Sequence, residues 1–296
     1  MSVADPTLNV RSDGMGLWSF GFLDPLLRRT FPHTRIVHDD SRAPDLVIRS
    51  HFTRQQSLAG YKCPYITWSG EVPPVQLLSD RAPLFEVNTA RSGRPNELWF
   101  PHLVAEIERT DRPDPIAMPK RWCCAYAFTA RIPERERFFW NMRIREPTCY
   151  AFGPSCKTSD NPFEVGRVDR GKNDSHFREF GYCVAMENCV APGYMTEKIG
   201  FAFAAGTVPI YRGDTATVSE FFNPASFINV SDFPSVEAAA EHAVQTWRDP
   251  QKYQKYLDAP LFLNDRLRDY EAIRTDYRSW QNPAVTSLRE AFPDLS

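Results

Sequence analysis

Polar and charged side chains gather at one loop of the otherwise apolar segment 182–213, YCVAMENCVAPGYMTEKIGFAFAAGTVPIYRG. The hydrophobic pattern predicts buried strands at Tyr182–Met186 and Val208–Tyr211, with a helix at Glu197–Ala205 between them. In such a β-α-β unit, the loop after the first strand and the start of the helix bind phosphates, because free backbone N–H groups point there. That loop and the first helical turn carry six polar residues: Glu187, Asn188, Tyr194, Thr196, Glu197 and Lys198. We therefore expect an anionic ligand at this loop.

Lys198 is the residue of this loop whose charge most needs an explanation. A cation in the first turn of a helix is disfavoured by the helix dipole unless an anion lies nearby. The alternative is that Lys198 extends into solvent beside Glu197. Glu187 and Asn188 end a buried strand, where an unpaired charge is costly, so they bond either backbone amides of the following loop or a ligand.

Arg135 and Arg137 lie in the segment IPERERFFW, at the start of a helix predicted at Glu134–Met142. A strand predicted at Trp122–Phe128 precedes this helix, so the two arginines lie at a second strand-to-helix crevice. A planar guanidinium can bind two phosphate oxygens at once. The alternative for each arginine is a position on a solvated helix face of alternating charge.

Glu71 is a single carboxylate that follows a strand predicted at Tyr65–Trp68. Its turn, SGEVPP, places it at the carboxyl end of the strand, where ligands bind in parallel sheets. A lone carboxylate at such a position is more often a turn residue than a catalyst, so both roles stay open. The histidines show no H-x-x-x-H spacing and Asp39-Asp40 is not a D-x-D pair, so no metal site is predicted and Asp40 is expected to cap a turn.

The wider pattern alternates strands with helices, which predicts an α/β fold with parallel sheets. Further elements are expected as strands at Leu8–Val10, Arg35–His38, Asp45–Arg49 and Phe227–Val230, and as helices at Phe22–Arg29, from Ser235 to Trp247 and around Tyr270–Trp280. The charged, proline-rich segment Glu108–Arg121 is the predicted linker, and Pro154–Arg178 is a predicted loop.

Two domains are expected on either side of this linker. Residues 1–118 would form an N-terminal acceptor-binding domain, and the tail at about 276–296 would pack back on it. Residues 119–275 would form a C-terminal domain that binds a nucleotide-linked donor. Two such domains, facing each other across a cleft, suit a two-substrate transferase.

Composition limits the classes of function. The chain has 296 residues and a net charge of −2, which argues against a nucleic-acid surface or a polybasic membrane anchor. No secretory signal and no apolar run of about 20 residues is present, so we expect a cytoplasmic protein without a transmembrane segment. The seven cysteines are odd in number and form no C-x-x-C pair, which favours reduced thiols.

Two segments of the chain are similar to a known family. MENCVAPGYMTEKIGFAFAAGTVPIYRG and FFNPASFINVSDF resemble the signature of the α-1,3/α-1,4-fucosyltransferases, glycosyltransferase family 10. YITWSGEVPP resembles the family segment whose glutamate is the catalytic base, which is Glu71 here. IPERERFF resembles the segment whose arginine binds the donor diphosphate, with Arg135 as the best match and Arg137 as the second.

The resemblance implies a fold, a reaction and a set of roles. The fold would be GT-B, with two Rossmann-like domains, and the donor would be GDP-β-L-fucose, transferred with inversion to an oligosaccharide or glycoconjugate. No tightly bound cofactor is implied, and a divalent metal such as Mn or Mg would at most stimulate the reaction. Catalytic roles would fall on Glu71, Arg135 and Lys198, and donor-binding roles on Asn188, Tyr194, Glu197, Lys198 and Arg135.

The sequence departs from the family pattern at Met186, at Cys189 and at Val72-Pro73-Pro74, and these departures bear on the choice of acceptor. Two alternatives stay open. The first is a glycosyltransferase of the same fold that uses another nucleotide sugar. The second is a non-catalytic protein that binds a sugar nucleotide. The acceptor glycan, its linkage and the oligomeric state have no signal in the sequence.

Overall fold

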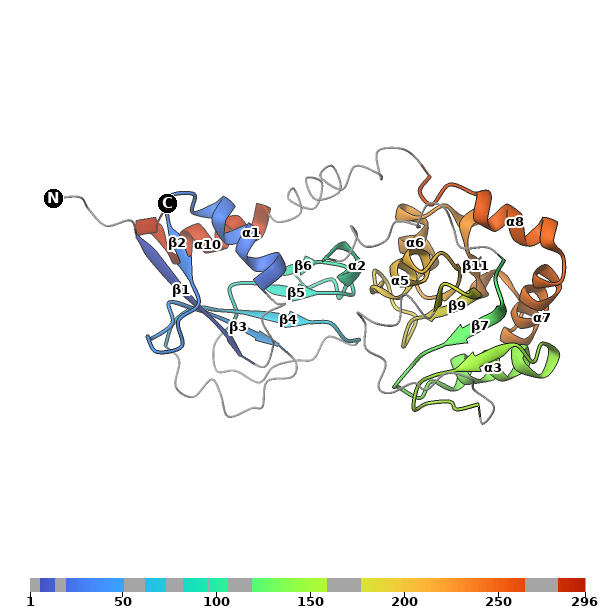
Figure 1. Cartoon of the computed structure of the whole chain (residues 1–296). Helices are drawn as coiled ribbons and strands as arrows, with labels where there is room; N and C mark the ends of the chain where they lie inside the picture. Colours follow the sequence, from blue (N-terminus) through green and yellow to red (C-terminus); the bar gives the residue numbers. More distant parts are fainter. Residues whose placement is uncertain are drawn as a thin grey trace. The chain divides into compact units, whose positions relative to one another are not determined.

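The chain folds into two compact units, each built on its own parallel sheet (Figure 1). The structure is a computed structural model and describes residues 6–13, 20–50, 62–72, 82–94, 96–105, 119–158, 177–263 and 282–295. One unit comprises residues 1–105 and 271–296, and the other comprises residues 106–270. The predicted α/β class with parallel sheets is confirmed.

The sheet of the first unit has the strand order β2-β1-β3-β4-β5-β6, and each neighbouring pair is parallel. Its strands are β1 (Thr7–Asp13), β2 (Arg35–Val37), β3 (Leu46–Ser50), β4 (Tyr65–Ser69), β5 (Glu86–Asn88) and β6 (Glu97–Trp99). Its helices are α1 (Phe20–Thr30), α2 (His102–Ala105), α10 (Asn282–Ala291) and the short 3-10 turn Pro293–Leu295. Helix α10 packs on α1, so the C-terminal residues belong to the first unit.

The sheet of the second unit has the strand order β11-β10-β9-β7-β8, again parallel throughout. Its strands are β7 (Trp122–Tyr126), β8 (Cys149–Ala151), β9 (Phe180–Met186), β10 (Val208–Arg212) and β11 (Ile228–Asn229). Its helices are α3 (Pro133–Arg145), α5 (Lys198–Ala204), α6 (Thr215–Phe221), α7 (Val236–Trp247) and α8 (Pro250–Asp258), with 3-10 turns at Pro224–Ser226 and Val230–Asp232.

Strand β9 is the centre of the second unit. All seven of its residues are buried, as expected for a parallel strand covered on both faces. Its alternate residues Tyr182, Val184 and Met186 share a core with α3, α7 and α8, whereas α5 contacts β9 and β10. Because Met186 of β9 is in register with Arg212 of β10, the residues that follow these strands emerge side by side at one edge of the sheet.

Local sequence signals explain where the main helices begin. Ser235 is the N-cap of α7, and its hydroxyl oxygen accepts a hydrogen bond from the backbone N–H of Ala238 at 3.1 Å, so the predicted start is confirmed. Helix α3 begins at Pro133, whose missing N–H costs nothing at the first helical position. Gly206 ends the α5 turn with φ of +67°, a conformation that glycine adopts without strain.

Several elements differ from the sequence-based expectation or lie outside it. Strands β5, β6 and β8 were not predicted, although β2 and β11, which are as short or shorter, were; helices α6 and α8 were also missed. Asp39, and not Asp40, caps the turn after β2, since its Oδ1 accepts from Ser41 N at 2.9 Å. The helix expected near residues 270–280, most of the linker and most of the 154–178 loop lie outside the described residues.

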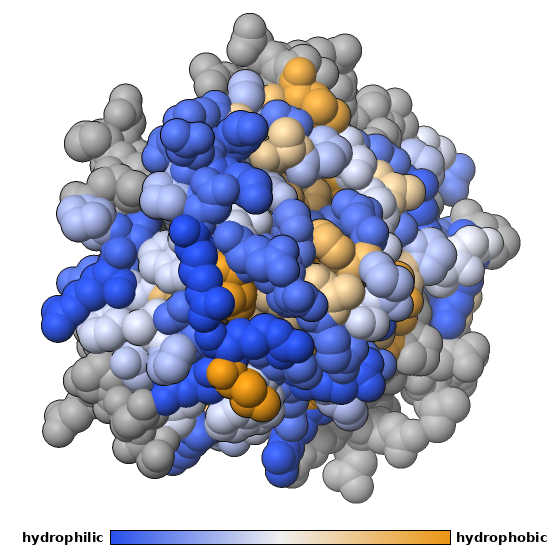
Figure 2. Space-filling model, turned by 90° about the vertical axis from the view of Figure 1, so that its right-hand side faces the viewer, coloured by the Kyte–Doolittle hydropathy of each residue, from blue (hydrophilic) through white to orange (hydrophobic). Residues whose placement is uncertain are grey.

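The face of the second unit in Figure 2 is mostly hydrophilic, and its apolar side chains form small separate areas. Among the helices that the structure describes, none is both long and apolar enough to cross a membrane. All seven cysteines are free.

Candidate functional site

The loop between β9 and α5 is organised around a buried carboxylate. Glu187 is fully buried and accepts hydrogen bonds from the backbone N–H of Thr196 at 2.7 Å and from the Thr196 hydroxyl at 2.8 Å. Lys198 Nζ donates to Glu187 Oε2 at 3.0 Å and to Thr196 Oγ1 at 2.7 Å. Of the alternatives for Glu187, the structure shows the bond to a loop amide, and Lys198 lies on Glu187 instead of extending into solvent.

This arrangement changes the explanation of the Lys198 charge. The anion beside Lys198 is a protein carboxylate, and the ammonium group balances a charge that would otherwise be buried alone. Helix α5 has only seven residues, so its dipole contributes little to the electrostatic environment of Lys198. Because the side chain of Lys198 remains 19% exposed, the ammonium group can also contact a ligand.

Arg135 lies beside the same loop and is 1% exposed. Its Nη2 donates to the Met186 carbonyl at 2.8 Å and to Asn188 Oδ1 at 3.0 Å, and its Cζ lies 3.7 Å from the centre of the Phe128 ring. Its Nε and Nη1 are buried and have no hydrogen-bond acceptor among the described residues. A charged group with two unused buried donors is costly, and two phosphate oxygens would remove that cost.

Arg137, the second arginine of the predicted pair, has a different environment. Its side chain is 58% exposed and pairs with Glu237 at 3.0 Å on the helix surface. The structure therefore places Arg135 at the loop and Arg137 on the solvated helix face that was its alternative.

Tyr194 and Glu197 complete the buried part of the loop, with 1% and 6% exposure. Tyr194 is close enough to Arg135 to influence its pKa. Glu197 is the last residue before α5 and makes no side-chain capping bond there. Gly193, with φ of +74°, donates its N–H to Asp214 Oδ2 at 2.8 Å, which ties the loop to the start of α6.

The electrostatics of the site favour an anion. Burial lowers the pKa of Arg135, and the charge of Arg212 lowers it further. Tyr126 and Glu187 raise the pKa of Arg135 and so act against burial. Burial raises the pKa of Tyr211 well above its usual value, with Glu187 the next cause, so this phenol stays protonated and its O–H can donate a hydrogen bond. Arg135 and Lys198 thus lie beside the fully buried carboxylate of Glu187, and Arg212 is close enough to Arg135 to lower its pKa.

Sequence reasoning missed Arg212, Phe128 and Asp214. Arg212 ends β10, and no other described residue makes a side-chain hydrogen bond or ion pair with it. The signal that could have found it is its position at the carboxyl end of the strand beside β9. Phe128 and Asp214 act through packing and a backbone bond, which spacing alone cannot reveal.

Glu71 lies in the first unit, two residues after β4, and is exposed. Its backbone carbonyl accepts a hydrogen bond from Ser69 Oγ at 3.3 Å. The expected position after a strand is confirmed, and its carboxylate makes no hydrogen bond or ion pair with the other described residues. The structure thus brings Arg135, Glu187, Asn188, Tyr194, Glu197 and Lys198 together in the second unit, while Glu71 belongs to the other unit. Over the part of the chain that the structure describes, no group of three or more potential metal ligands occurs.

Comparison with known proteins gives this site a family. Residues 127–260 match the family described as glycosyltransferase family 10 (fucosyltransferase), C-terminal. The resemblance to glycosyltransferase family 10 is thus confirmed over residues 127–260. The matched segment includes Arg135 and the whole loop from Glu187 to Lys198, whereas Glu71 lies before it.

Individual relatives agree with this family. The α-(1,3)-fucosyltransferase FucT of Helicobacter pylori is 31% identical over 143 residues, which is 48% of this chain and 27% of that protein. The α-(1,4)-fucosyltransferase of Arabidopsis thaliana is 35% identical over 82 residues, 28% of this chain and 20% of that protein. The chain thus spans about a quarter of the length of the curated family-10 relatives it matches.

A solved α1,3-fucosyltransferase structure with GDP-fucose matches 95% of this chain and 92% of that chain, with a TM-score of 0.63 and 16% identity. This likeness extends over both units and shows the fold. The chain therefore has the GT-B type of fold, with two Rossmann-like units.

Gly153, just after β8, packs against the backbone of Phe128, whose ring contacts Arg135 at the site. A Cβ at this position would lie 1.9 Å from the backbone oxygen of Phe128. Because backbone and not a flexible side chain blocks the space, we expect Gly153→Ala to lower the free energy of unfolding by roughly 1–3 kcal/mol. Urea denaturation monitored by circular dichroism measures this loss. An unchanged midpoint would mean that the Phe128 carbonyl moves freely.

Proposed function

We propose that the protein is an inverting fucosyltransferase that transfers L-fucose from GDP-β-L-fucose to a hydroxyl group of an acceptor glycan. The observation that carries the proposal is the buried Arg135 guanidinium, with two unused donors, beside the Lys198–Glu187 pair in the family-10 segment. Two of the structural relatives are α1,3-fucosyltransferases, one with GDP-fucose and one with GDP, and they support this donor.

In the proposed reaction, Glu71 removes the proton of the acceptor hydroxyl while that oxygen forms a bond to C1 of fucose. The bond between C1 and the β-phosphate oxygen breaks, and its electron pair leaves with GDP. Attack on the face opposite the leaving group inverts the configuration at C1. Arg135 and Lys198 compensate the charge that develops on the β-phosphate, so no step requires a metal.

The other residues of the loop receive supporting roles. Asn188 Oδ1 is held by Arg135, which leaves the amide nitrogen of Asn188 to donate to a sugar hydroxyl or to the loop. Glu197 would accept from ribose hydroxyls, and Tyr194 would pack beside the donor. Glu187 would have a partly structural role, because it positions Lys198 through their 3.0 Å ion pair.

A panel of nucleotide sugars tests the donor. We expect GDP-fucose to raise the melting temperature more than GDP-mannose, UDP-glucose or UDP-galactose, because only a bound ligand stabilises the folded state. Greater stabilisation by another nucleotide sugar would indicate that its sugar, and not fucose, is the donor sugar. No stabilisation by any member of the panel would contradict the whole proposal.

Lys198→Ala should weaken the binding of GDP by roughly ten- to a hundredfold but leave the weaker binding of guanosine nearly unchanged, because only GDP carries the diphosphate charge. Isothermal titration calorimetry with both ligands measures the two affinities. Equal losses for GDP and guanosine would rule out a diphosphate role for Lys198.

A matched double variant separates this effect from loss of folding. Lys198→Ala alone leaves the buried carboxylate of Glu187 without its cation and should reduce stability. Lys198→Ala with Glu187→Gln removes both charges, so stability should recover while GDP affinity stays low. Recovery of GDP affinity in the double variant would mean that Lys198 acts on the fold alone.

A further inference from the structure

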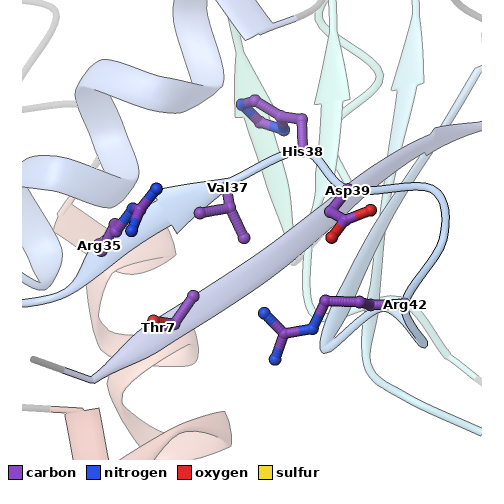
Figure 3. A pocket seen from close by; sticks show the side chains of 6 residues that line it. All are labelled: Thr7, Arg35, Val37, His38, Asp39 and Arg42. Carbon is purple, nitrogen blue, oxygen red and sulfur yellow. The ribbon is translucent and has the colours of Figure 1, made fainter. Parts of the chain in front are cut away.

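The first unit has a polar pocket of about 260 Å³ along its edge strand β2 (Figure 3). It runs along the strand and into the turn that follows. The residues that line it are Thr7, Arg35, Val37, His38, Asp39 and Arg42. Because β2 is the outermost strand of the sheet order, the pocket lies at the sheet edge.

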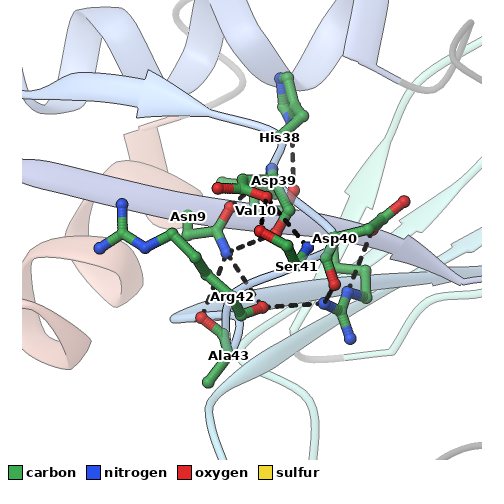
Figure 4. Close-up of polar contacts among 9 residues, drawn as sticks. Asn9, Val10, His38, Asp39, Asp40, Ser41, Arg42 and Ala43 are labelled. Carbon is green, nitrogen blue, oxygen red and sulfur yellow. Dashed lines mark hydrogen bonds and ion pairs between the residues drawn. The ribbon is translucent and has the colours of Figure 1, made fainter.

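Hydrogen bonds from side chains of β1 fix the backbone of the turn that carries Arg42. Asn9 of β1 is 2% exposed, and its Nδ2 donates to the Asp39 carbonyl at 3.0 Å and to the Ala43 carbonyl at 3.1 Å. Its Oδ1 accepts from the backbone N–H of Asp39 at 2.9 Å (Figure 4). Arg11 Nη2 donates to the Arg42 carbonyl at 2.8 Å. The backbone of residues 39–43 is therefore fixed by the sheet, and this fixes the point from which the Arg42 side chain extends.

Two guanidinium groups of the pocket are available to a ligand. Arg35 extends from the first residue of β2, and Arg42 reaches across the same face from the turn (Figure 3). Neither has a side-chain hydrogen bond or an ion pair with another described residue. By contrast, Arg11 of the same unit pairs with Asp40 at 3.2 Å and Arg94 pairs with Glu86 at 2.6 Å. Within the described residues, the pocket thus holds two guanidinium groups without a direct ion pair, with the Asp39 carboxylate close enough to Arg42 to interact with its charge.

The remaining groups of the pocket limit the kind of ligand. Asp39 Oδ1 accepts from Ser41 N and Ser41 Oγ at 2.9 and 2.6 Å, and these bonds hold the pKa of Asp39 below its usual value. Asp39 therefore stays ionised, and its Oδ2 can accept a further hydrogen bond. His38 is engaged elsewhere, with Nδ1 3.0 Å from the Val10 carbonyl and Nε2 3.1 Å from Asp24. Two cations beside a carboxylate suit a ligand that has one anionic group and also hydroxyl donors.

We propose that this pocket binds an acidic sugar residue of the acceptor glycan, with Arg35 and Arg42 on its carboxylate or sulfate group and Asp39 on a ring hydroxyl. The inference rests on the proposed function for its choice of a glycan. A volume of about 260 Å³ exceeds what an isolated oxyanion needs and suits a single sugar ring.

The sheet also relates this pocket to Glu71 within the first unit. Strand β2 ends opposite Asn9 of β1, whereas β3 begins opposite Val10, so the turn after β2 lies near the amino end of β3 and Glu71 follows the carboxyl end of β4. Three strand spacings and the length of β3 and β4 separate the two positions, roughly 20–25 Å. An extended oligosaccharide spans such a distance, so the acidic residue would lie several sugars from the hydroxyl that accepts fucose.

Direct binding measurements test the proposal without the donor. Methyl β-glucuronide, methyl β-glucoside and inorganic sulfate would be titrated into the full chain at low ionic strength and followed by saturation-transfer NMR. We expect the glucuronide to bind and the uncharged glucoside to bind at least tenfold more weakly. Arg35→Gln and Arg42→Gln should each weaken glucuronide binding by roughly three- to tenfold. The matched control Arg28→Gln, on the exposed side of α1, should not change it.

Asp39→Asn distinguishes a sugar from a free anion. Asparagine keeps the oxygen that accepts from Ser41 but removes the negative charge, so sulfate should bind more tightly while the glucuronide loses an acceptor and binds no better. Equal binding of glucuronide and glucoside, equal effects of Arg42→Gln and Arg28→Gln, or tighter binding of both anions to Asp39→Asn would overturn the acidic-sugar proposal. Failure of the proposed function would appear separately, as absence of stabilisation by nucleotide sugars.

Discussion

Glu71→Gln should lower the rate of fucosyl transfer by about two to four orders of magnitude, the usual contribution of a general base, and leave GDP binding nearly unchanged. The amide keeps the shape of the side chain but cannot take a proton from the acceptor hydroxyl. Because the Glu71 carboxylate is exposed and makes no hydrogen bond or ion pair among the described residues, the substitution should not disturb the fold. The measurement is steady-state release of GDP from GDP-fucose in the presence of acceptor.

The control for Glu71 is Glu290→Gln, an exposed carboxylate on α10 of the same unit. It removes the same charge from the same unit and should leave turnover intact. If turnover by Glu71→Gln equals that of Glu290→Gln, another group is the base.

Arg135→Gln should have the second large effect, a loss of GDP affinity of roughly ten- to a hundredfold together with lower stability. The stability loss arises because the Met186 carbonyl and Asn188 Oδ1 lose a charged donor and the Phe128 ring loses its packing partner. Calorimetric titration with GDP, at a temperature where the variant is folded, separates the two effects. Arg135→Lys keeps the charge but not the planar guanidinium. Its GDP affinity should therefore lie between that of the wild type and that of Arg135→Gln.

Arg137→Gln is the matched control for Arg135, two residues along the same helix. Its ion pair with Glu237 is largely exposed and contributes little, so stability and GDP affinity should both stay within experimental error of the wild type. If Arg137→Gln lost as much GDP affinity as Arg135→Gln, the assignment of the diphosphate to Arg135 would be wrong.

The β9–α5–β10 unit could be predicted from sequence because its signals are local. The apolar run Tyr182–Met186 and Gly206 after α5 predict the strand and the helix end without knowledge of distant residues, and β9 begins two residues earlier than predicted. Strands β5, β6 and β8 could not be predicted in the same way. Such strands are defined by the neighbours with which they pair, and β5 owes its place to β4 and β6 on either side.

The site shows the same division between local and distant information. The sequence placed Lys198 and Glu187 in one loop, but not their 3.0 Å ion pair, because the path of the loop between them decides whether they meet. The preference for Arg135 over Arg137 depends on which side of α3 faces the sheet, and the weak apolar period of PERERFFW does not reveal it. Arg212 is a cation that only the pairing of β10 with β9 brings to this loop.

The most direct test of the central claim is to incubate the wild-type protein with GDP-β-L-fucose and a set of neutral and acidic oligosaccharides, and to follow the anomeric proton of fucose by NMR. The account predicts that the β-linked donor signal is replaced by that of an α-fucoside as GDP appears, with no added metal. Donor binding without GDP release in the presence of any acceptor, or a β-fucoside as product, would contradict it.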